Sequence, residues 1–356
     1  MTLSLRNIIP IIKAQFVGTN DIAIIDTISI DSRSLQNTES TLFFALLGPN
    51  HDGHQYVTTL INQGVQNFVV SYIPSKLQGK ANFLVVENTL VALQTIAATY
   101  RSDFDFPVIG ITGSNGKTII KEWLNFLLSP DYNIIRSPKS YNSQVGVPLS
   151  VLGINEKHNL GIFEAGISTT NEMKNLQKII QPTIGILTNI GSAHDEGFHD
   201  VGEKIKEKLK LFTSVEVLIM NKNRTIEAFL NPKIKTFTWS SEDGKADVFV
   251  IAKESAEKTE FKITYQKLCF KITIPFSDQA SIENTIQCLM VLLYLGYDQA
   301  VIQQRIALLY PVEMRLKVKN GNNNTTIIDD SYSSDFQSLM IALDFLESQK
   351  QYKKKT

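Results

Sequence analysis

A glycine-rich segment between an expected strand and an expected helix has the composition of a phosphate-binding loop. It reads Gly110-Ile-Thr-Gly-Ser-Asn-Gly-Lys-Thr118. Lys117 would reach the β- and γ-phosphates of a nucleotide, and the Thr118 hydroxyl would bind Mg²⁺. The strict G-x-x-x-x-G-K-[ST] pattern fails at residue 111, which is Ile, so the segment predicts a nucleotide but no particular reaction. The backbone N–H groups expected to surround the phosphates, together with the helix N-terminus, belong to Gly113, Ser114, Asn115 and Gly116.

Three further polar residues follow later expected strands: Glu164, His194 and Lys208. Ligands of open α/β sheets gather at the carboxyl ends of strands, so these residues are candidates for the same site. Taken singly, each has a simpler explanation: a capping or surface acid, a polar histidine with its bonds satisfied, and one of several lysines on a solvated helix face. Their joint placement around one phosphate loop favours Glu164 and His194 as Mg²⁺ ligands.

Short apolar runs alternate with helical stretches from residue 108 onward, which predicts a doubly wound parallel α/β sheet. The expected strands are 108–112, 160–163, 184–187 and 215–220, and the expected helices between them are 119–128, 172–180 and 201–212. Residues 247–276 alternate apolar and polar side chains, as antiparallel hairpins do, and helices at 282–295 and 299–309 follow.

The pattern predicts three domains. Residues 1–106 form a small α/β domain, residues 107–312 form the central nucleotide-binding domain, and residues 313–356 begin a third α/β domain with a strand, a turn, a strand and a helix. About 45 residues are too few to bury a core of their own, so this last domain is expected to be truncated.

Composition excludes several functional classes. The 356 residues contain 35 Lys and Arg and 35 Asp and Glu, so no overall field favours nucleic acid or an anionic membrane. We find neither a signal peptide nor an apolar stretch of the roughly 20 residues that cross a bilayer. Only two cysteines occur, Cys269 and Cys288, and both are expected to be buried free thiols. These features predict a cytoplasmic globular protein.

Three motifs together resemble the ATP-dependent Mur ligases of bacterial peptidoglycan synthesis. They are Thr112-Gly-Ser-Asn-Gly-Lys-Thr118, Glu164-Ala-Gly166 and Asn189-Ile-Gly-Ser-Ala-His194. Members of that family carry this Gly-Lys-Thr form of the loop, which accounts for Ile at residue 111. Residues 163–168 and 193–198 resemble the branch that adds D-alanyl-D-alanine. The segments 31–33, 42–46 and 52–54 resemble the family's UDP-sugar domain, and the likeness runs from about residue 25 to the last helix.

The resemblance implies roles for the loop and its neighbours. Lys117 and Thr118 would hold the phosphates of ATP and a first Mg²⁺ ion, with Glu164 on the same ion. His194 would bind a second Mg²⁺, supported by Lys208 at the position of the family's carbamoylated lysine. Further implied contacts are Ser32 and Arg33 with uridine, Asn142 in the active site, Asn284 near adenine, and Arg315 and Asp330 with the nucleotide.

The reaction implied is amide formation through an acyl phosphate. Its substrates would be UDP-N-acetylmuramoyl-tripeptide, D-alanyl-D-alanine and ATP, with two Mg²⁺ ions as cofactors and with no nucleic acid or membrane insertion involved. The oligomeric state stays open. Ser143, Glu283 and Ser333 depart from residues common in the family, which affects nucleotide positioning more than reaction type.

Two alternatives remain at this point. A folylpolyglutamate synthase-like ligase has similar central machinery, but the Asp31-Ser-Arg33 and Asp52-Gly-His54 segments argue against it. Alternatively, the chain binds its ligands without turnover, as a fragment of a longer protein. The amino-acid sequences of residues 139–143 and 207–212 resemble those of a ligase form that some bacteria fuse to an alanine racemase, which suggests such a fragment.

Overall fold

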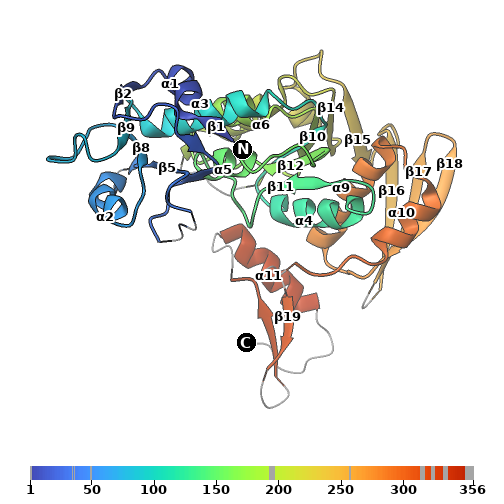
Figure 1. Ribbon diagram of the computed structural model, residues 1–356. Helices are drawn as coiled ribbons and strands as arrows, with labels where there is room; N and C mark the ends of the chain where they lie inside the picture. Colours follow the sequence, from blue (N-terminus) through green and yellow to red (C-terminus); the bar gives the residue numbers. More distant parts are fainter. Residues whose placement is uncertain are drawn as a thin grey trace. The chain divides into compact units, whose positions relative to one another are not determined.

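A computed structural model describes most of the chain (Figure 1). The described residues are 2–33, 35, 37–48, 50–191, 197–255, 258–312, 317–321, 325–331 and 336–348. Contacts divide the chain into two compact units. The first comprises Met1–Phe106, Tyr141–His158 and Lys178–Gln181, and the second comprises Pro107–Ser140, Asn159–Gln177 and Pro182–Thr356. The three-domain division stays a prediction.

The first unit is built on a five-stranded sheet in the order β2-β9-β8-β5-β4. Four strands are parallel, and β2 is antiparallel to β9. The rings of Phe43, Phe68 and Phe83 pack in its core, with centroids 6.2 and 5.6 Å apart. The strands are β2 (Gln15–Val17), β4 (Thr27–Ser29), β5 (Thr41–Phe44), β8 (Asn67–Val70) and β9 (Asn82–Val85).

Helices and short strand pairs complete this unit. The pairs are β1 (Leu3–Ser4) with β3 (Ile24–Ile25) and β6 (Leu47–Gly48) with β7 (His51–Asp52). The helices are α1 (Leu5–Ile12), α2 (Val57–Asn62), α3 (Thr89–Arg101) and α5 (Gly146–Val151), with a 3-10 turn, η1, at Gly53–Tyr56.

The second unit contains a nine-stranded sheet in the order β11-β12-β10-β13-β14-β15-β16-β17-β18. Pairing is parallel as far as β16 and antiparallel beyond it, which confirms the predicted doubly wound sheet with an antiparallel extension. The chain passes from β12 on one side of β10 to β13 on the other. Ligands of such sheets bind at this kind of reversal, beyond the carboxyl ends of the strands.

The strands of this sheet are β10 (Val108–Thr112), β11 (Ile134–Arg136), β12 (Leu160–Glu164), β13 (Ile184–Leu187), β14 (Val217–Asn221), β15 (Thr236–Ser240), β16 (Val248–Glu254), β17 (Thr259–Tyr265) and β18 (Leu268–Ile274). The helices are α4 (Lys117–Leu128), α6 (Met173–Ile180), α7 (Val201–Leu209) with η3 (Lys210–Phe212), α8 (Arg224–Glu227), α9 (Gln279–Tyr294) and α10 (Gln299–Ile306). Near the C-terminus, β19 (Lys317–Asn320) and β20 (Thr326–Asp329) form a hairpin before α11 (Phe336–Ser348).

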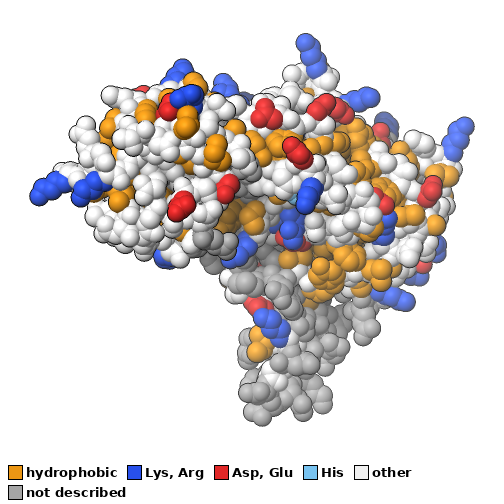
Figure 2. Space-filling view, viewed as in Figure 1, with side chains coloured by type: hydrophobic (Ala, Val, Ile, Leu, Met, Phe, Trp, Pro, Cys, Tyr) orange, Lys and Arg blue, Asp and Glu red, His pale blue; other side chains and the backbone are white. Residues whose placement is uncertain are grey.

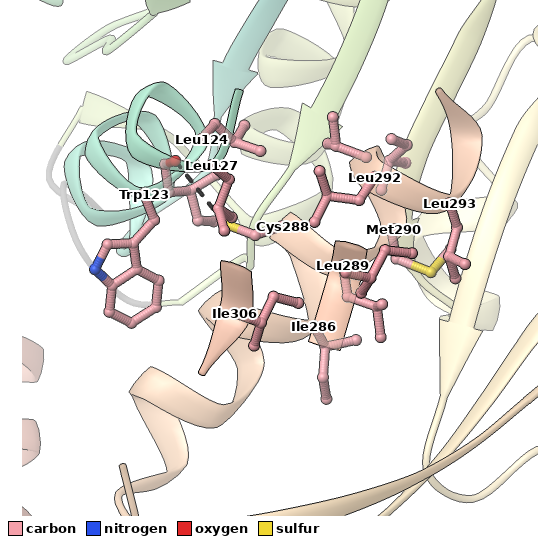
Figure 3. Packing of buried hydrophobic residues seen from close by; sticks show 14 of the residues in the cluster. Trp123, Leu124, Leu127, Ile286, Cys288, Leu289, Met290, Leu292, Leu293 and Ile306 are labelled. Atoms are coloured by element: carbon pink, nitrogen blue, oxygen red, sulfur yellow. Dashed lines mark hydrogen bonds between the residues drawn. The ribbon is translucent and has the colours of Figure 1, made fainter. Parts of the chain in front are cut away.

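The core of the second unit fixes α4, the helix that follows the phosphate loop. Trp123, Leu124 and Leu127 of α4 lie beside Cys288 and its neighbours on α9 (Figure 3). The Trp123 ring stacks on Phe276 with centroids 5.0 Å apart, and its Nε1 donates to the Tyr310 carbonyl at 2.8 Å. Burying such side chains contributes roughly 1.5–3 kcal/mol each, so α4 is held firmly by its apolar face.

The prediction that both cysteines are buried is half wrong. Cys288 is fully buried, and burial raises the pKa of its thiol, whereas Cys269 is exposed. Cys269 lies on β18 at the edge of the sheet, where Phe270 and Ile272 face inward and alternate with exposed residues. On the face of the molecule that Figure 2 shows, acidic and basic side chains are interspersed, in keeping with the balanced charge.

Candidate nucleotide-binding site

The phosphate loop turns sharply between β10 and α4, and two of its glycines cannot be replaced without a clash. Gly113 and Gly116 have φ of +147° and +83°, values that favour glycine. A Cβ on Gly113 would lie 1.9 Å from the Thr188 hydroxyl oxygen, and one on Gly116 would lie 2.3 Å from Oδ1 of Asn284. The close approach at Gly116 places Asn284 of α9 beside the start of α4, and its contact with adenine stays a prediction.

The end of β13 holds the loop in place. The N–H groups of Ser114 and Asn115 donate to the carbonyl and side-chain oxygens of Asn189, at 2.9 and 3.0 Å. The Thr188 hydroxyl donates to the Asn115 carbonyl at 2.6 Å, and the N–H of Gly191 donates to the Ser114 hydroxyl at 2.9 Å. Two of the N–H groups expected at the phosphates are therefore engaged by Asn189 in this structure. The N-terminus of α4 is the anion-binding end that this arrangement presents.

Three lysine side chains converge on the carbonyl groups of this region. Nζ of Lys117 donates to the carbonyls of Gly113 and Ser114 at 2.9 and 3.0 Å, and Nζ of Lys208 donates to Gly113 at 3.1 Å. Lys204 bonds to the Gly191 carbonyl. Burial lowers the pKa of Lys208 to about 7, assisted by the positive charges of Lys117 and Lys204.

The interpretation of Lys208 as part of a solvated lysine face is wrong. Lys204 and Lys208 are 1% and 2% exposed, because both project from α7 toward the loop. Ammonium groups are seldom buried this deeply unless they are hydrogen-bonded or paired with an opposite charge. Lys117 and Lys204, with the protonated fraction of Lys208, give the loop a concentrated positive charge, suited to the phosphates of a nucleotide.

Thr118 and Glu164 meet at the carboxyl ends of β10 and β12. The Thr118 hydroxyl donates to Oε2 of Glu164 at 3.0 Å and lies 2.8 Å from the Ser140 hydroxyl. The other carboxylate oxygen, Oε1, is buried and forms an ion pair with the Lys121 ammonium at 3.1 Å. Hydroxyl and carboxylate oxygens are the ligands that Mg²⁺ prefers, so the donor chemistry of this pair fits such an ion.

No group of three or more His, Cys, Asp and Glu side chains gathers as a metal site within the described ranges. Mg²⁺ commonly takes one or two protein carboxylates and completes its shell with water and substrate phosphates, which suits a site built on Glu164 and Thr118. His194, the expected ligand of a second ion, lies outside the described residues, as do Arg315 and Ser333.

A cavity of about 330 Å³ adjoins the loop. It opens at the carboxyl ends of β13 and β14, and its wall shares Thr188 and Asn189 with the contacts that hold the loop. Glu283, which precedes Asn284 on α9, also lines it. The volume is at the lower end of the range for small-molecule sites, and the mixture of apolar, amide and hydroxyl groups suits a planar polar ligand. The remaining lining residues are Leu187, Ile190, Val201, Ile205, Met220, Asn221, Asn223, Thr225, Ile226 and Trp239.

The candidate uridine residues belong to the first unit and are far more exposed. The Arg33 guanidinium, 86% exposed, donates to the two carboxylate oxygens of Asp31 at 2.9 and 3.0 Å. Hydrogen bonds from Arg33 hold the pKa of Asp31 at about 2. Ser32 lies between them in the same turn. Among the described residues of the first unit, the guanidinium forms no hydrogen bond other than those to Asp31.

In the Asp52-Gly-His54 motif, the buried His54 side chain contacts half-exposed Asp52 and the residues at the carboxyl end of β8. Nδ1 of His54 donates to Asp52 at 2.7 Å, and its Nε2 accepts the backbone N–H of Ser71 at 2.9 Å. Tyr72 stacks on the His54 ring with centroids 4.2 Å apart, and its hydroxyl donates to Asp52 at 2.8 Å. Because Nε2 accepts the Ser71 N–H and Nδ1 bonds to Asp52, the His54 ring links the segment before η1 to the residues that follow β8.

Other predicted residues are not brought to the loop by described contacts. Asn142 belongs to the first unit, and Ser143 beside it accepts the N–H of Gly146 at 3.1 Å. Asp330 directly follows β20. Conversely, Lys121, Ser140 and Asn189 contact the predicted site residues without having been singled out. Lys204, whose charge acts on Lys208, was not singled out either. A lysine one turn beyond Lys117 on an otherwise apolar helix face was a signal available for Lys121.

Fold and site together define a phosphate-loop protein whose loop lies at the reversal of a doubly wound sheet. The family of the Mur ligase middle domain matches residues 111–292, and the chain belongs to the Mur ligases. This match confirms the resemblance noted in the sequence.

Curated relatives extend the match over most of the chain. A UDP-N-acetylmuramoyl-tripeptide–D-alanyl-D-alanine ligase from Buchnera aphidicola is 27% identical, over 92% of this chain and 72% of the relative. The ligase of the same name from Borreliella burgdorferi is 29% identical, over 92% of this chain and 73% of its own length.

Among solved structures, a MurF crystal structure from Acinetobacter baumannii has a TM-score of 0.87 at 22% identity, covering 98% of this chain and 77% of that one. This likeness confirms the predicted fold class. None of the helices that the structure describes has the length and apolar character needed to span a membrane.

Proposed function

We propose that the chain is an ATP-dependent ligase that joins UDP-N-acetylmuramoyl-tripeptide to D-alanyl-D-alanine. The observation that carries this proposal is the cluster of half-buried Lys117 and Thr118 with buried Glu164 and Lys208 around a phosphate loop, in a chain whose curated relatives bear that activity in their names. The proposal places the enzyme in the cytoplasm, where ATP and nucleotide-linked sugars are found.

The reaction has two steps. The terminal carboxylate of the tripeptide attacks the γ-phosphorus of ATP, which forms an acyl phosphate and releases ADP. The amine of D-alanyl-D-alanine then attacks the acyl carbon, the C–O bond to phosphate breaks, and a proton leaves the nitrogen. The first step brings anions together, so positioning and charge neutralisation supply most of the catalysis.

The residues of the second unit provide these effects. Lys117 begins α4 beside the loop, and its ammonium can turn from the carbonyls of Gly113 and Ser114 to the phosphates. Thr118 and Glu164 would hold a Mg²⁺ ion through oxygen atoms, and that ion would neutralise phosphate charge. The 330 Å³ cavity lies within reach of the loop through Thr188 and Asn189 and would take the adenosine end of ATP.

Lys208 has the properties required of a carbamoylated lysine. Its pKa of about 7 leaves a substantial fraction of the amine neutral near neutral pH, and a neutral amine can attack CO₂ to form a carbamate with loss of one proton. The product carries a negative charge among the positive charges of Lys117 and Lys204, which favours it electrostatically. We propose this modification and a second Mg²⁺ ion held with His194.

The test is product formation by the full chain. The protein is incubated with UDP-N-acetylmuramoyl-tripeptide, D-alanyl-D-alanine and MgATP, and ADP and product are measured by mass spectrometry, with each substrate omitted in turn. The proposal predicts a product heavier than the tripeptide substrate by D-alanyl-D-alanine minus water, formed only in the complete mixture.

A folate-dependent release of ADP would favour the folylpolyglutamate synthase-like alternative. If the chain binds ATP and UDP-N-acetylmuramoyl-tripeptide but forms no product, the result would favour a protein that binds these ligands without catalysing the reaction.

A further inference from the structure

Lys121 is a buried cation beside the phosphate loop that the proposed chemistry does not use. It lies on α4, one turn after Lys117, and its side chain is completely buried. Removing an ammonium group from water costs several kcal/mol unless its donors are all engaged, so burial at this position requires strong partners. Those partners show what the side chain does.

The Lys121 ammonium joins three segments of the second unit. It donates to the Ser137 carbonyl at 2.8 Å and also to the Lys139 carbonyl, in the loop that follows β11. On the other side it lies 3.1 Å from Oε1 of Glu164, at the end of β12, and 3.0 Å from Glu122 on its own helix. One cation therefore connects the loop helix, the β11 loop and the carboxylate at the end of β12.

Both connections end on the Thr118 hydroxyl. Through Glu164, Lys121 orients the carboxylate whose Oε2 accepts from Thr118 at 3.0 Å. Through the β11 loop, it fixes the segment that brings the Ser140 hydroxyl to 2.8 Å from Thr118. The loop also bonds directly to the strand end, since the Ser137 hydroxyl accepts the Glu164 N–H at 3.2 Å.

The backbone at Lys139 shows that the β11 loop is held in a strained form. Its φ of +50° lies in the left-handed region, which costs a residue with a side chain about 1 kcal/mol or more. That conformation directs the Lys139 carbonyl to the Lys121 ammonium. A strained backbone persists where surrounding contacts over-determine it, and Lys121 supplies one of these contacts.

From this arrangement we infer that Lys121 is a positioning residue for the magnesium-dependent part of the nucleotide site. It sets the Glu164 carboxylate and the Ser140 hydroxyl around Thr118 and does not itself touch the phosphates. The inference rests on the proposed ATP site but assigns to Lys121 a task distinct from that of Lys117. Residues that orient metal ligands typically change metal affinity 10–100-fold when they are removed.

The experiment measures binding of a non-hydrolysable ATP analogue, AMP-PNP, to the full chain by calorimetry, with and without Mg²⁺. The ratio of the two dissociation constants reports how much the ion tightens binding. For Lys121→Met we expect this ratio to fall at least tenfold, while the dissociation constant without Mg²⁺ changes less than threefold. An unchanged ratio in a folded variant would overturn the inference, and so would a higher one, because it would mean that Lys121 only competes with the ion for Glu164.

Arg101→Met is the matched control. Arg101 is another buried cation, which donates to the Ile180 carbonyl at 3.2 Å within the first unit. Its loss should lower the unfolding temperature and leave the Mg²⁺ ratio unchanged.

If Lys121→Met does not fold, the same ratio of dissociation constants is measured for Lys121→Arg. It keeps the charge that compensates Glu164, but its planar guanidinium cannot reproduce the same set of contacts. A ratio reduced at least threefold supports the inference, and the wild-type ratio contradicts it. Failure of the underlying ATP site has a different signature, because the wild-type chain would then not bind AMP-PNP under either condition.

Discussion

The phosphate loop and the turn that carries Arg33 differ in how firmly their charged side chains are held. Around the loop, Glu164 is fully buried and Lys117 and Lys208 share the Gly113 carbonyl. Arg33 is 86% exposed and pairs with Asp31 in its own turn. The site at the phosphate loop is therefore organised before any ligand binds, because its charged groups are already buried in the folded protein. The turn that carries Arg33 can redirect its guanidinium toward an anion at little cost.

This contrast has a consequence for mutagenesis. Substitutions at the loop should alter stability and binding together, because the same contacts serve both. Substitutions in the turn should alter binding alone, because an exposed ion pair contributes little to folding.

Lys117→Met should have the largest effect. Loss of an electrostatic stabiliser of the transition state lowers turnover on the order of 10²–10³-fold, so ATP-dependent product formation should fall by that factor. The measurement is the initial rate of ADP release with all substrates present. Lys253→Met, at an exposed position on β16, is the control and should match the wild type. Near-normal turnover in Lys117→Met would remove the loop from the mechanism.

Gly113→Ala should destabilise the second unit by about 1–3 kcal/mol, because the new Cβ would overlap the Thr188 hydroxyl and the backbone has φ of +147°. Urea unfolding measures the free energy. Gly244→Ala is the matched control, since a Cβ at Gly244 meets nothing within 4 Å. Equal stability of the two variants would show that the loop is not held in the form described.

Lys208 should make stability depend on pH. Its folded pKa of about 7 lies below the ordinary 10.5, so between these values the unfolded chain binds more protons than the folded one. Stability therefore rises with pH across this window, by up to about 1.4 kcal/mol per pH unit from this group. Lys208→Met should remove that slope. Urea unfolding at pH 7 and pH 9 in CO₂-free buffer tests it, and identical slopes in variant and wild type would contradict the assignment.

Arg33→Ala should have the smallest effect on folding, within about 0.5 kcal/mol. Its effect on UDP binding should nevertheless be roughly tenfold, in the range of a hydrogen bond to a charged group. Calorimetric titration with UDP and a urea melt of the same sample measure both quantities. A clear loss of stability, or unchanged affinity for UDP, would show that the turn does not behave as a loosely held binding element.

The sequence was sufficient for the parts of the fold that rest on local chemistry. Continuous apolar runs predicted β10, β12 and β13, and the position of Glu164 at a strand end predicted that it lies near the phosphate loop, where it contacts Thr118. Strands buried on both faces of a parallel sheet are continuously apolar, and parallel strands place their carboxyl ends at one edge of the sheet.

Features that depend on tertiary contacts escaped prediction. β11 has only three half-buried residues at the sheet edge and shows no strand pattern of its own. β15 alternates Thr and Ser with Phe and Trp, a strand-favouring pattern that was available in the sequence and was missed. The burial of Lys121 and Lys204 is invisible in composition, because only folding brings carbonyls and carboxylates to their ammonium groups.

The proposed function is tested most directly by titrating the full chain with UDP-N-acetylmuramoyl-tripeptide, in the presence of Mg²⁺ and AMP-PNP, with UDP alone as the reference. A ligase of this specificity must recognise the sugar and peptide as well as the nucleotide. We predict that the tripeptide ligand binds much more tightly than UDP. Equal affinity for the two ligands, or binding of neither by a chain shown to be folded, would contradict the proposed function.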